Sequence, residues 1–98
     1  MKISEINTEI ICKYINEFPE NLDTVDTQLL EALKSSAISY VGGYTGLTVE
    51  EIEQHEDITT AVLVLIADMW DNRQLEIDNS NINLVVENIL SMYRVNLL

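Results

Sequence analysis

The stretch from Ala61 to Arg73 constrains the fold of this chain more than any other segment. Seven consecutive apolar residues, Ala61 to Ala67, lead into Asp68 and Trp70 and then into an Asn-Arg pair. Such a run must bury most of its circumference, and its polar end must lie where the buried part stops. The sequence therefore predicts a central helix that ends in a cluster of polar and aromatic side chains.

The spacing of apolar residues near the beginning of the chain predicts a first helix over about residues 4–17. Ser4 is placed to cap this helix, and Glu5 lies favourably in its first turn. Pro19 prevents continuation because the residue before a proline is pushed out of the helical region. The apolar positions at steps of three and four are Ile6, Ile10, Tyr14, Ile15 and Phe18.

A second, longer helix is predicted from Asp23 or Thr24, either of which can cap it, to Gly46, which suits a helix C-terminus. Gly42 and Gly43 lower the helix propensity of its last turns, and they would also allow another backbone to approach closely. Its apolar positions are Val25, Leu29, Leu33, Ala37, Tyr40, Val41 and Tyr44. The segment Thr48–Glu51 matches a capping box and predicts a short helix over about residues 49–54.

The central segment becomes the third long helix, with Asp57 as its predicted cap. Leu63 and Val64 widen its apolar stripe, which indicates several neighbouring helices or contact with another subunit. Its other apolar positions are Ile58, Ala61, Val62, Leu65, Ile66, Met69 and Trp70. A polar loop over residues 74–81 then precedes a fourth helix over about residues 82–93, followed by an apolar tail at residues 95–98.

These elements predict an all-α fold: a small four-helix bundle with an extra short helix and no sheet. The 98 residues suffice for one domain, residues 1–98, with one modest core. The longest apolar run is too short to cross a bilayer, and no secretory leader precedes the first helix, so a soluble protein made inside the cell, without a membrane partner, is expected.

The net charge of -12, with 17 acidic and 5 basic residues, argues against nucleic-acid binding because such a surface repels phosphates. The charge is uneven: residues 1–57 carry 12 acids and 3 bases, a net charge of -9. The first part of the chain is therefore expected to build the acidic surface.

Catalytic and ligand-binding chemistry has few candidates. His55 stands among acids without a second histidine, which favours an exposed turn over a metal site. Cys12 follows two isoleucines and reads as a small buried residue instead of a nucleophile. The glycines lack the lysine and the preceding strand of a phosphate loop. We therefore expect no catalytic residue, no metal and no cofactor.

Trp70 and Arg73 lie three residues apart, on one face of the predicted central helix. In one interpretation, Trp70 completes the core and Arg73 caps the helix end. In the other, both contact a second subunit, because tryptophan and arginine are frequent anchors of interfaces. Leu97 and Leu98, in the apolar tail, are further candidates for docking on a neighbouring subunit or another connector.

Five motifs occur in an order that resembles the small head-tail connector (adaptor) family of tailed bacteriophages. They are Lys13-Tyr14-Ile15, the acidic turn Asp23 to Asp26, Tyr44-Thr45-Gly46, the apolar helix Ala61 to Trp70 with Asn72-Arg73, and Tyr93-Arg94. Each motif alone is weak, but the ordered set covers nearly the whole chain. The segment between Arg73 and Ile82 is shorter than in many members of that family.

The resemblance implies a structural virion protein and not an enzyme. Such a protein would be made in the cytoplasm of the bacterial host and would form a ring, expected to be dodecameric, at the head-tail junction. Its partners would be the portal protein and the next connector or tail-completion protein. DNA would pass through the channel without specific binding, and a negatively charged wall would suit such a conduit because like charge disfavours adhesion.

Two other functions fit the same sequence. A small acidic regulator that mimics the charge of DNA could block a nucleic-acid-binding protein, and the net charge of -12 suits it equally well. A helical scaffold subunit of a cellular complex is the third possibility. A DNA mimic should be a monomer or dimer with acids spaced like phosphates, whereas a connector should assemble into a ring.

Overall fold

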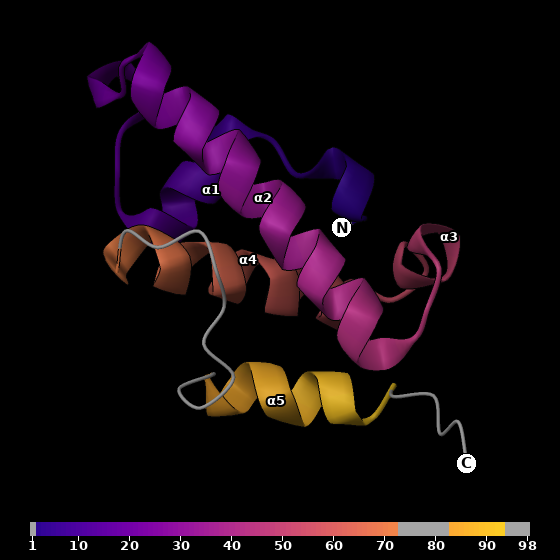
Figure 1. Cartoon of the computed structure of the whole chain (residues 1–98). Coiled ribbons are helices and arrows are strands. Elements are labelled where there is room, and N and C mark those ends of the chain that lie inside the picture. Colours follow the sequence, from indigo (N-terminus) through magenta and orange to yellow (C-terminus); the bar gives the residue numbers. More distant parts are fainter. Residues whose placement is uncertain (1, 73–82, 94–98) are drawn as a thin grey trace.

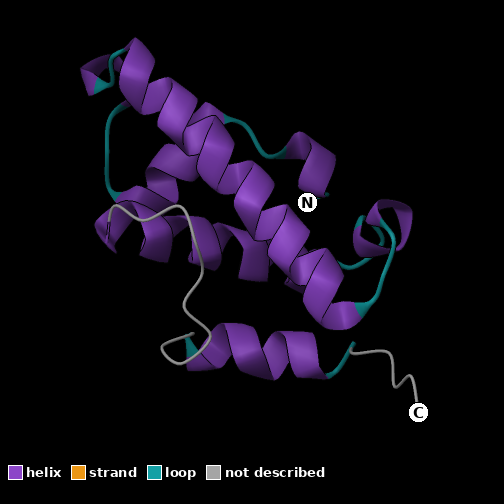
Figure 2. Cartoon of the chain, viewed as in Figure 1, coloured by secondary structure: helices purple, strands orange, loops and turns teal. Residues whose placement is uncertain are grey.

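The regular structure of the chain consists of helices and turns, as a computed structural model that describes residues 2–72 and 83–93 shows (Figures 1 and 2). The longer helices are α1 (Thr8–Ile15), α2 (Thr24–Thr45), α4 (Glu56–Asn72) and α5 (Leu84–Ser91). Shorter elements are α3 (Val49–Ile52) and the 3-10 turns η1 (Ile3–Glu5) and η2 (Pro19–Asn21). The described residues contain no strand, so the predicted all-α class, with one extra short helix, is confirmed.

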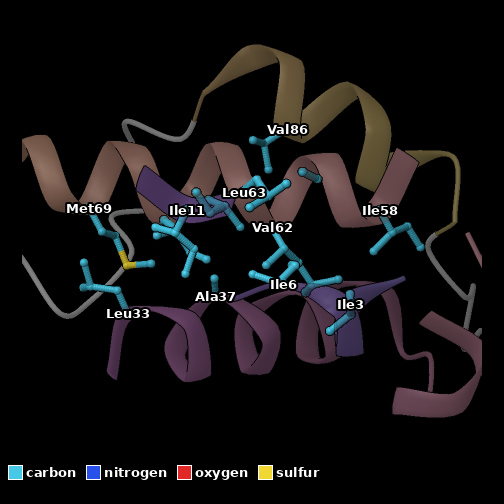
Figure 3. Close-up of a cluster of buried hydrophobic side chains, with 14 of the residues drawn as sticks. Ile3, Ile6, Ile11, Leu33, Ala37, Ile58, Val62, Leu63, Met69 and Val86 are labelled. Atoms are coloured by element: carbon cyan, nitrogen blue, oxygen red, sulfur yellow. The ribbon is translucent and has the colours of Figure 1, made fainter. Parts of the chain in front are cut away.

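Helix α4 forms the centre of the molecule. Its neighbours α1, α2 and α5 all pack against it, and α2 runs obliquely across it (Figure 1). Figure 3 shows Met69, Val62 and Ile58 spread along α4 and facing residues of α2 and of the N-terminal segment. The buried residues of α4 are Ile58, Thr59, Ala61, Val62, Leu63, Leu65, Ile66, Met69 and Trp70. Helices of the same chain therefore cover the wide stripe, and a second subunit is not needed to explain it.

Helices α4 and α5 run antiparallel, with a polar contact near each end. The Tyr93 hydroxyl, just after α5, lies 2.8 and 2.7 Å from the two carboxylate oxygens of Asp57 and donates its proton to them. The side chain of Asn83, the N-cap of α5, forms a hydrogen bond with Asp68 of α4. These contacts fix how far α5 is shifted along α4. The predicted cap Asp57 is wrong: it lies within the first turn of α4 and holds Tyr93 instead.

Both ends of α2 are set by local chemistry. Asp23 accepts a hydrogen bond from the Asp26 backbone N–H at 2.8 Å, as an N-cap should. At the other end, the buried Thr45 hydroxyl donates to the Val41 carbonyl at 2.7 Å and accepts from the Leu47 N–H at 3.2 Å. Gly46 follows with φ 77°, the left-handed conformation in which glycine carries no steric cost. The predicted caps of α2 are confirmed.

The paired glycines near the end of α2 allow no unusually close contact within the described residues. A Cβ on Gly42 would lie 3.8 Å from the Leu47 carbonyl oxygen, an ordinary distance, and none of the described atoms would lie within 4 Å of a Cβ on Gly43. The expected close approach of another backbone is therefore absent from this part of the chain.

The beginning of the chain differs from the prediction. Ser4 lies in η1, and α1 begins only at Thr8, where the Asn7 side chain accepts a hydrogen bond from the Ile10 N–H at 2.9 Å. The non-helical backbone before α1 is held by distant side chains. Lys34 Nζ donates to the Ile6 carbonyl at 2.9 Å, and the Ser4 N–H donates to Glu53 Oε1 at 3.2 Å.

The buried face of α1 also differs, because the helix is only eight residues long and ends at Asn16, which has a positive φ of 59°. Ile11, Cys12 and Ile15 are its buried residues. Ile3 and Ile6 join the core from outside the helix. Several residues whose spacing predicts burial are exposed, namely Tyr14, Phe18 and Val25.

The remaining boundaries agree with the prediction within a few residues. Helix α3 is capped by Thr48 as expected but ends at Ile52 instead of residue 54. Helix α5 occupies Leu84–Ser91, within the predicted range of 82–93. The predicted loop over residues 74–81 and the apolar tail over residues 95–98 lie outside the described residues.

Candidate interaction surfaces

Trp70 belongs to the core of the single chain. Only 4% of its surface is exposed, and it packs in the same cluster as Met69 and Ile66. This burial favours the interpretation in which Trp70 completes the core, because a partner would reach little of the indole. Arg73, Leu97 and Leu98 lie outside the described residues. The contact of these four residues with another subunit stays a prediction.

His55 and Cys12 have structural surroundings. The His55 ring contacts the ring of Tyr93, with centroids 4.5 Å apart, in the turn before α4. Cys12 is buried on α1, and burial raises the pKa of its thiol, with Glu17 and Glu20 adding to the effect. Within residues 2–72 and 83–93, no group of three or more potential ligands is arranged to hold a metal ion. None of the helices in this part of the chain combines the length and apolarity that a bilayer span requires.

The outer face of α5 is a surface that the helical spacing did not predict. Val86 and Leu90 point into the core, whereas Leu84, Val85 and Met92 are 67%, 55% and 69% exposed. At 100° per residue these three side chains, with Asn88 between them, share one side of the helix. We call Leu84, Val85, Asn88 and Met92 the outer face of α5.

A signal for this surface exists in the sequence. The segment Leu84–Ser91 has apolar residues on nearly every side and a single charged residue, Glu87. A helix that is apolar all round is typically buried all round. The core needs only one stripe of this segment, so its remaining apolar residues require another explanation. In a chain of net charge -12, an uncharged apolar face is a place where another chain can pack without meeting like charge.

A hollow lies at the other end of the molecule, between α1 and η2. Its lining is mostly apolar and includes Cys12, Pro19 and Phe18, the last of which is 66% exposed. We call it the α1–η2 hollow. The exposed Phe18 ring adds apolar surface to the edge of this hollow, against which an apolar side chain of another molecule can pack.

Carboxylates surround the α1–η2 hollow. Glu9, Glu17 and Glu20 contribute to its lining, and Lys13 is the one base among the described residues that line it. The negative potential extends to the buried thiol, since both Glu17 and Glu20 raise the pKa of Cys12 after burial has raised it. The hollow therefore combines an apolar interior with a negative potential.

Three of the motifs that suggest a family lie at helix ends. Thr45 and Gly46 terminate α2. Asn72 is the last residue of α4, and its side-chain amide donates to the Asp68 carbonyl at 2.9 Å. Tyr93 ties the end of α5 to the start of α4. Each of these residues therefore has a structural role: Thr45, Gly46 and Asn72 lie at the ends of their helices, and Tyr93 joins α5 to α4.

Comparisons of the chain with protein-family models, with curated proteins and with solved structures give no match.

Proposed function

We propose that this chain is a structural virion protein that assembles as a ring between the portal of a phage head and the tail and lines the channel for DNA. The observation that carries the proposal is the order of the five motifs along the chain, from Lys13-Tyr14-Ile15 to Tyr93-Arg94. The all-α fold, with a long second helix and a central apolar helix, is the architecture that the resemblance implies.

Two surface properties support an assembly role. The outer face of α5 offers exposed apolar side chains that a neighbouring subunit or the portal can cover. The acidic remainder of the surface suits a channel wall, because a net charge of -12 per subunit repels passing DNA instead of binding it. In a ring, the outer face of α5 would supply contacts between proteins, and the acidic surface would keep the DNA from adhering to the channel wall.

Native mass spectrometry of the chain, alone and mixed with the portal protein encoded in the same genome, tests the proposal. A ring whose stoichiometry matches the portal, expected to be dodecameric, supports it. Absence of any complex with the portal at low and moderate salt contradicts it. The outer face supplies a matched pair of variants: Leu84→Ser with Met92→Ser should weaken the complex, whereas Ser39→Ala, at an exposed site on α2, should not.

Native mass spectrometry with a basic DNA-binding protein of the host distinguishes the DNA-mimic alternative from the connector function. An acidic mimic should bind a basic DNA-binding protein of the host and be displaced by duplex DNA, because both compete for one positive surface. A connector should bind the portal and should not bind such a protein. Binding to the host protein that duplex DNA reverses, without binding to the portal, would replace the proposed function with the alternative.

A further inference from the structure

The α1–η2 hollow selects its occupant by charge and by polarity. Its apolar lining, with Phe18 exposed beside it, favours aliphatic side chains. Its carboxylates on Glu9, Glu17 and Glu20 repel acidic segments and attract a base. The matching occupant is a short segment that carries apolar residues, one base and no acid.

One segment of this chain has that composition. Residues 88–98 contain no acidic residue, although the chain carries 17 acids, and residues 94–98 combine Arg94 with Val95, Leu97 and Leu98. A positive side chain beside three aliphatic ones complements an apolar hollow with a negative surround. This charge complementarity is specific to residues 94–98, because the other bases of the chain all have an acid within four residues.

Residues 94–98 cannot reach the hollow of their own chain. Tyr93 is held at Asp57, in the first turn of α4, and five residues extend at most about 17 Å beyond it. The hollow adjoins η2, which precedes the start of α2. The far end of α2, 22 residues away and hence about 33 Å along the helix, lies near α3 and the start of α4 (Figure 1). Any occupant of this composition from the same sequence must come from another copy.

We propose that residues 94–98 of one copy dock in the α1–η2 hollow of a second copy, with the aliphatic side chains against Phe18 and Arg94 facing the glutamates. The contact joins two different surfaces, so it is heterologous. Repeated from copy to copy, a heterologous contact closes a ring when its rotation divides a full turn and otherwise builds an open filament. It deepens the proposed function and rests on it only in naming one contact between neighbouring subunits.

The test is a titration followed by NMR that requires neither a ring nor a portal. The probe is an acetylated and amidated peptide of residues 92–98, added to the ¹⁵N-labelled full chain carrying Leu97→Ser and Leu98→Ser so that its own tail competes weakly. We expect amide shifts confined to residues 9–20. The double substitution Glu17→Gln with Glu20→Gln should raise the Kd for the peptide on the order of tenfold, about threefold for each carboxylate removed.

Matched controls separate site binding from general attraction to an acidic protein. Glu50→Gln with Glu87→Gln removes the same charge from α3 and α5, away from the hollow, and should change the Kd by less than about twofold. A peptide with serine at Met92, Tyr93, Val95, Leu97 and Leu98 keeps the arginine but loses the apolar side chains, and should not bind. The same titration with Phe18→Ser should show weakened binding, and since Phe18 is exposed the chain should stay folded.

The inference is overturned if the peptide shifts no amide up to about 1 mM, shifts a different face, or binds both charge variants equally. The outcomes also distinguish this contact from the proposed function. If a ring forms on the portal but the peptide does not bind at the hollow, the proposed function is supported and the proposed contact is contradicted. If the peptide binds at the hollow but the chain forms no complex with the portal, the self-association site is supported and the connector function is contradicted.

Discussion

At the scale of single residues, Thr59 is an exception within the core. Only 1% of its surface is exposed, and its hydroxyl has no hydrogen-bond partner among the described residues. Thr45, the other buried threonine, both donates and accepts. Burial of a hydroxyl without a partner costs free energy because the group loses its hydrogen bonds to water.

Thr59→Val should therefore raise the free energy of unfolding by about 1 to 2 kcal/mol, since valine has the same shape without the polar group. Urea denaturation followed by circular dichroism measures the change. Thr45→Val is the matched control and should lower stability, because it removes two hydrogen bonds. An unchanged or lower urea midpoint for Thr59→Val would mean that the hydroxyl has a partner in solution.

Asp68 of α4 is a partly buried carboxyl group at the contact with α5. Burial raises the pKa of its carboxyl and Asp71 adds to the rise, whereas the hydrogen bond from Asn83 lowers it. The net effect is a raised pKa, so the folded chain holds the proton more tightly than the unfolded chain does. Ionised Asp68 therefore opposes folding, and this cost appears as pH rises from the unfolded pKa through the folded one.

Asp68→Asn should remove that cost while keeping an oxygen that accepts the bond from Asn83. We expect the variant to be more stable than the parent at about pH 7, and the gain to shrink as the pH is lowered from there through the raised pKa of Asp68, where the parent takes up its proton. Urea midpoints over this range measure the effect. Glu31→Gln removes the same charge from an exposed position on α2 and should show no such pH-dependent gain. A gain that grows as pH falls would contradict the assignment.

At the scale of elements, α4 determines whether the chain folds at all. It contacts α1, α2 and α5, and most of its side chains in the run Ala61–Ala67 are buried. Helices α1, α2 and α5 contact one another less than they contact α4. Loss of packing on α4 therefore weakens several helix pairs together.

Leu65→Ala should leave a cavity in this helix and cost about 2 to 5 kcal/mol, a large part of the stability of a small domain. Leu65 is 3% exposed, so little relaxation into solvent is possible. Thr60→Ala, at an exposed position of the same helix, is the control and should change the urea midpoint little. A Leu65→Ala chain as stable as the parent would show that α4 is not the centre of the fold.

At the scale of the whole molecule, charge opposes assembly. Each copy carries a net charge of -12, and copies in the proposed ring would repel one another over a Debye length of about 10 Å at 0.1 M salt. Self-assembly or assembly on the portal should therefore strengthen as salt rises from about 0.02 M to about 0.2 M. Sedimentation velocity measures this dependence.

The peptide of residues 92–98 should behave in the opposite way. It carries one positive charge and enters a negative hollow, so its binding should weaken over the same salt range. A ring that weakens with salt in parallel with the peptide would show that attraction between opposite charges, and not repulsion between whole subunits, controls assembly.

Local sequence determined which segments are helical and where several of them begin and end. Asp23, Thr48 and Gly46 act within three or four residues of the backbone groups that they satisfy. The central position of α4 was equally readable, because an uninterrupted apolar run leaves no side for water. These features depend on neighbours along the chain, and the sequence supplies those neighbours.

The tertiary structure decided the features that depend on distant residues. The non-helical backbone before α1 is held by Lys34 and Glu53, 28 and 49 residues from the backbone groups that they contact. Asp57 became an acceptor for Tyr93 instead of a cap, since the end of α5 lies beside it in the fold. Three surface features also depend on the tertiary structure: the exposure of Phe18, the outer face of α5 and the α1–η2 hollow. Each lies where no neighbouring helix covers the chain. The periodicity of apolar residues predicts which side of a helix is apolar, but it does not predict which element packs against that side.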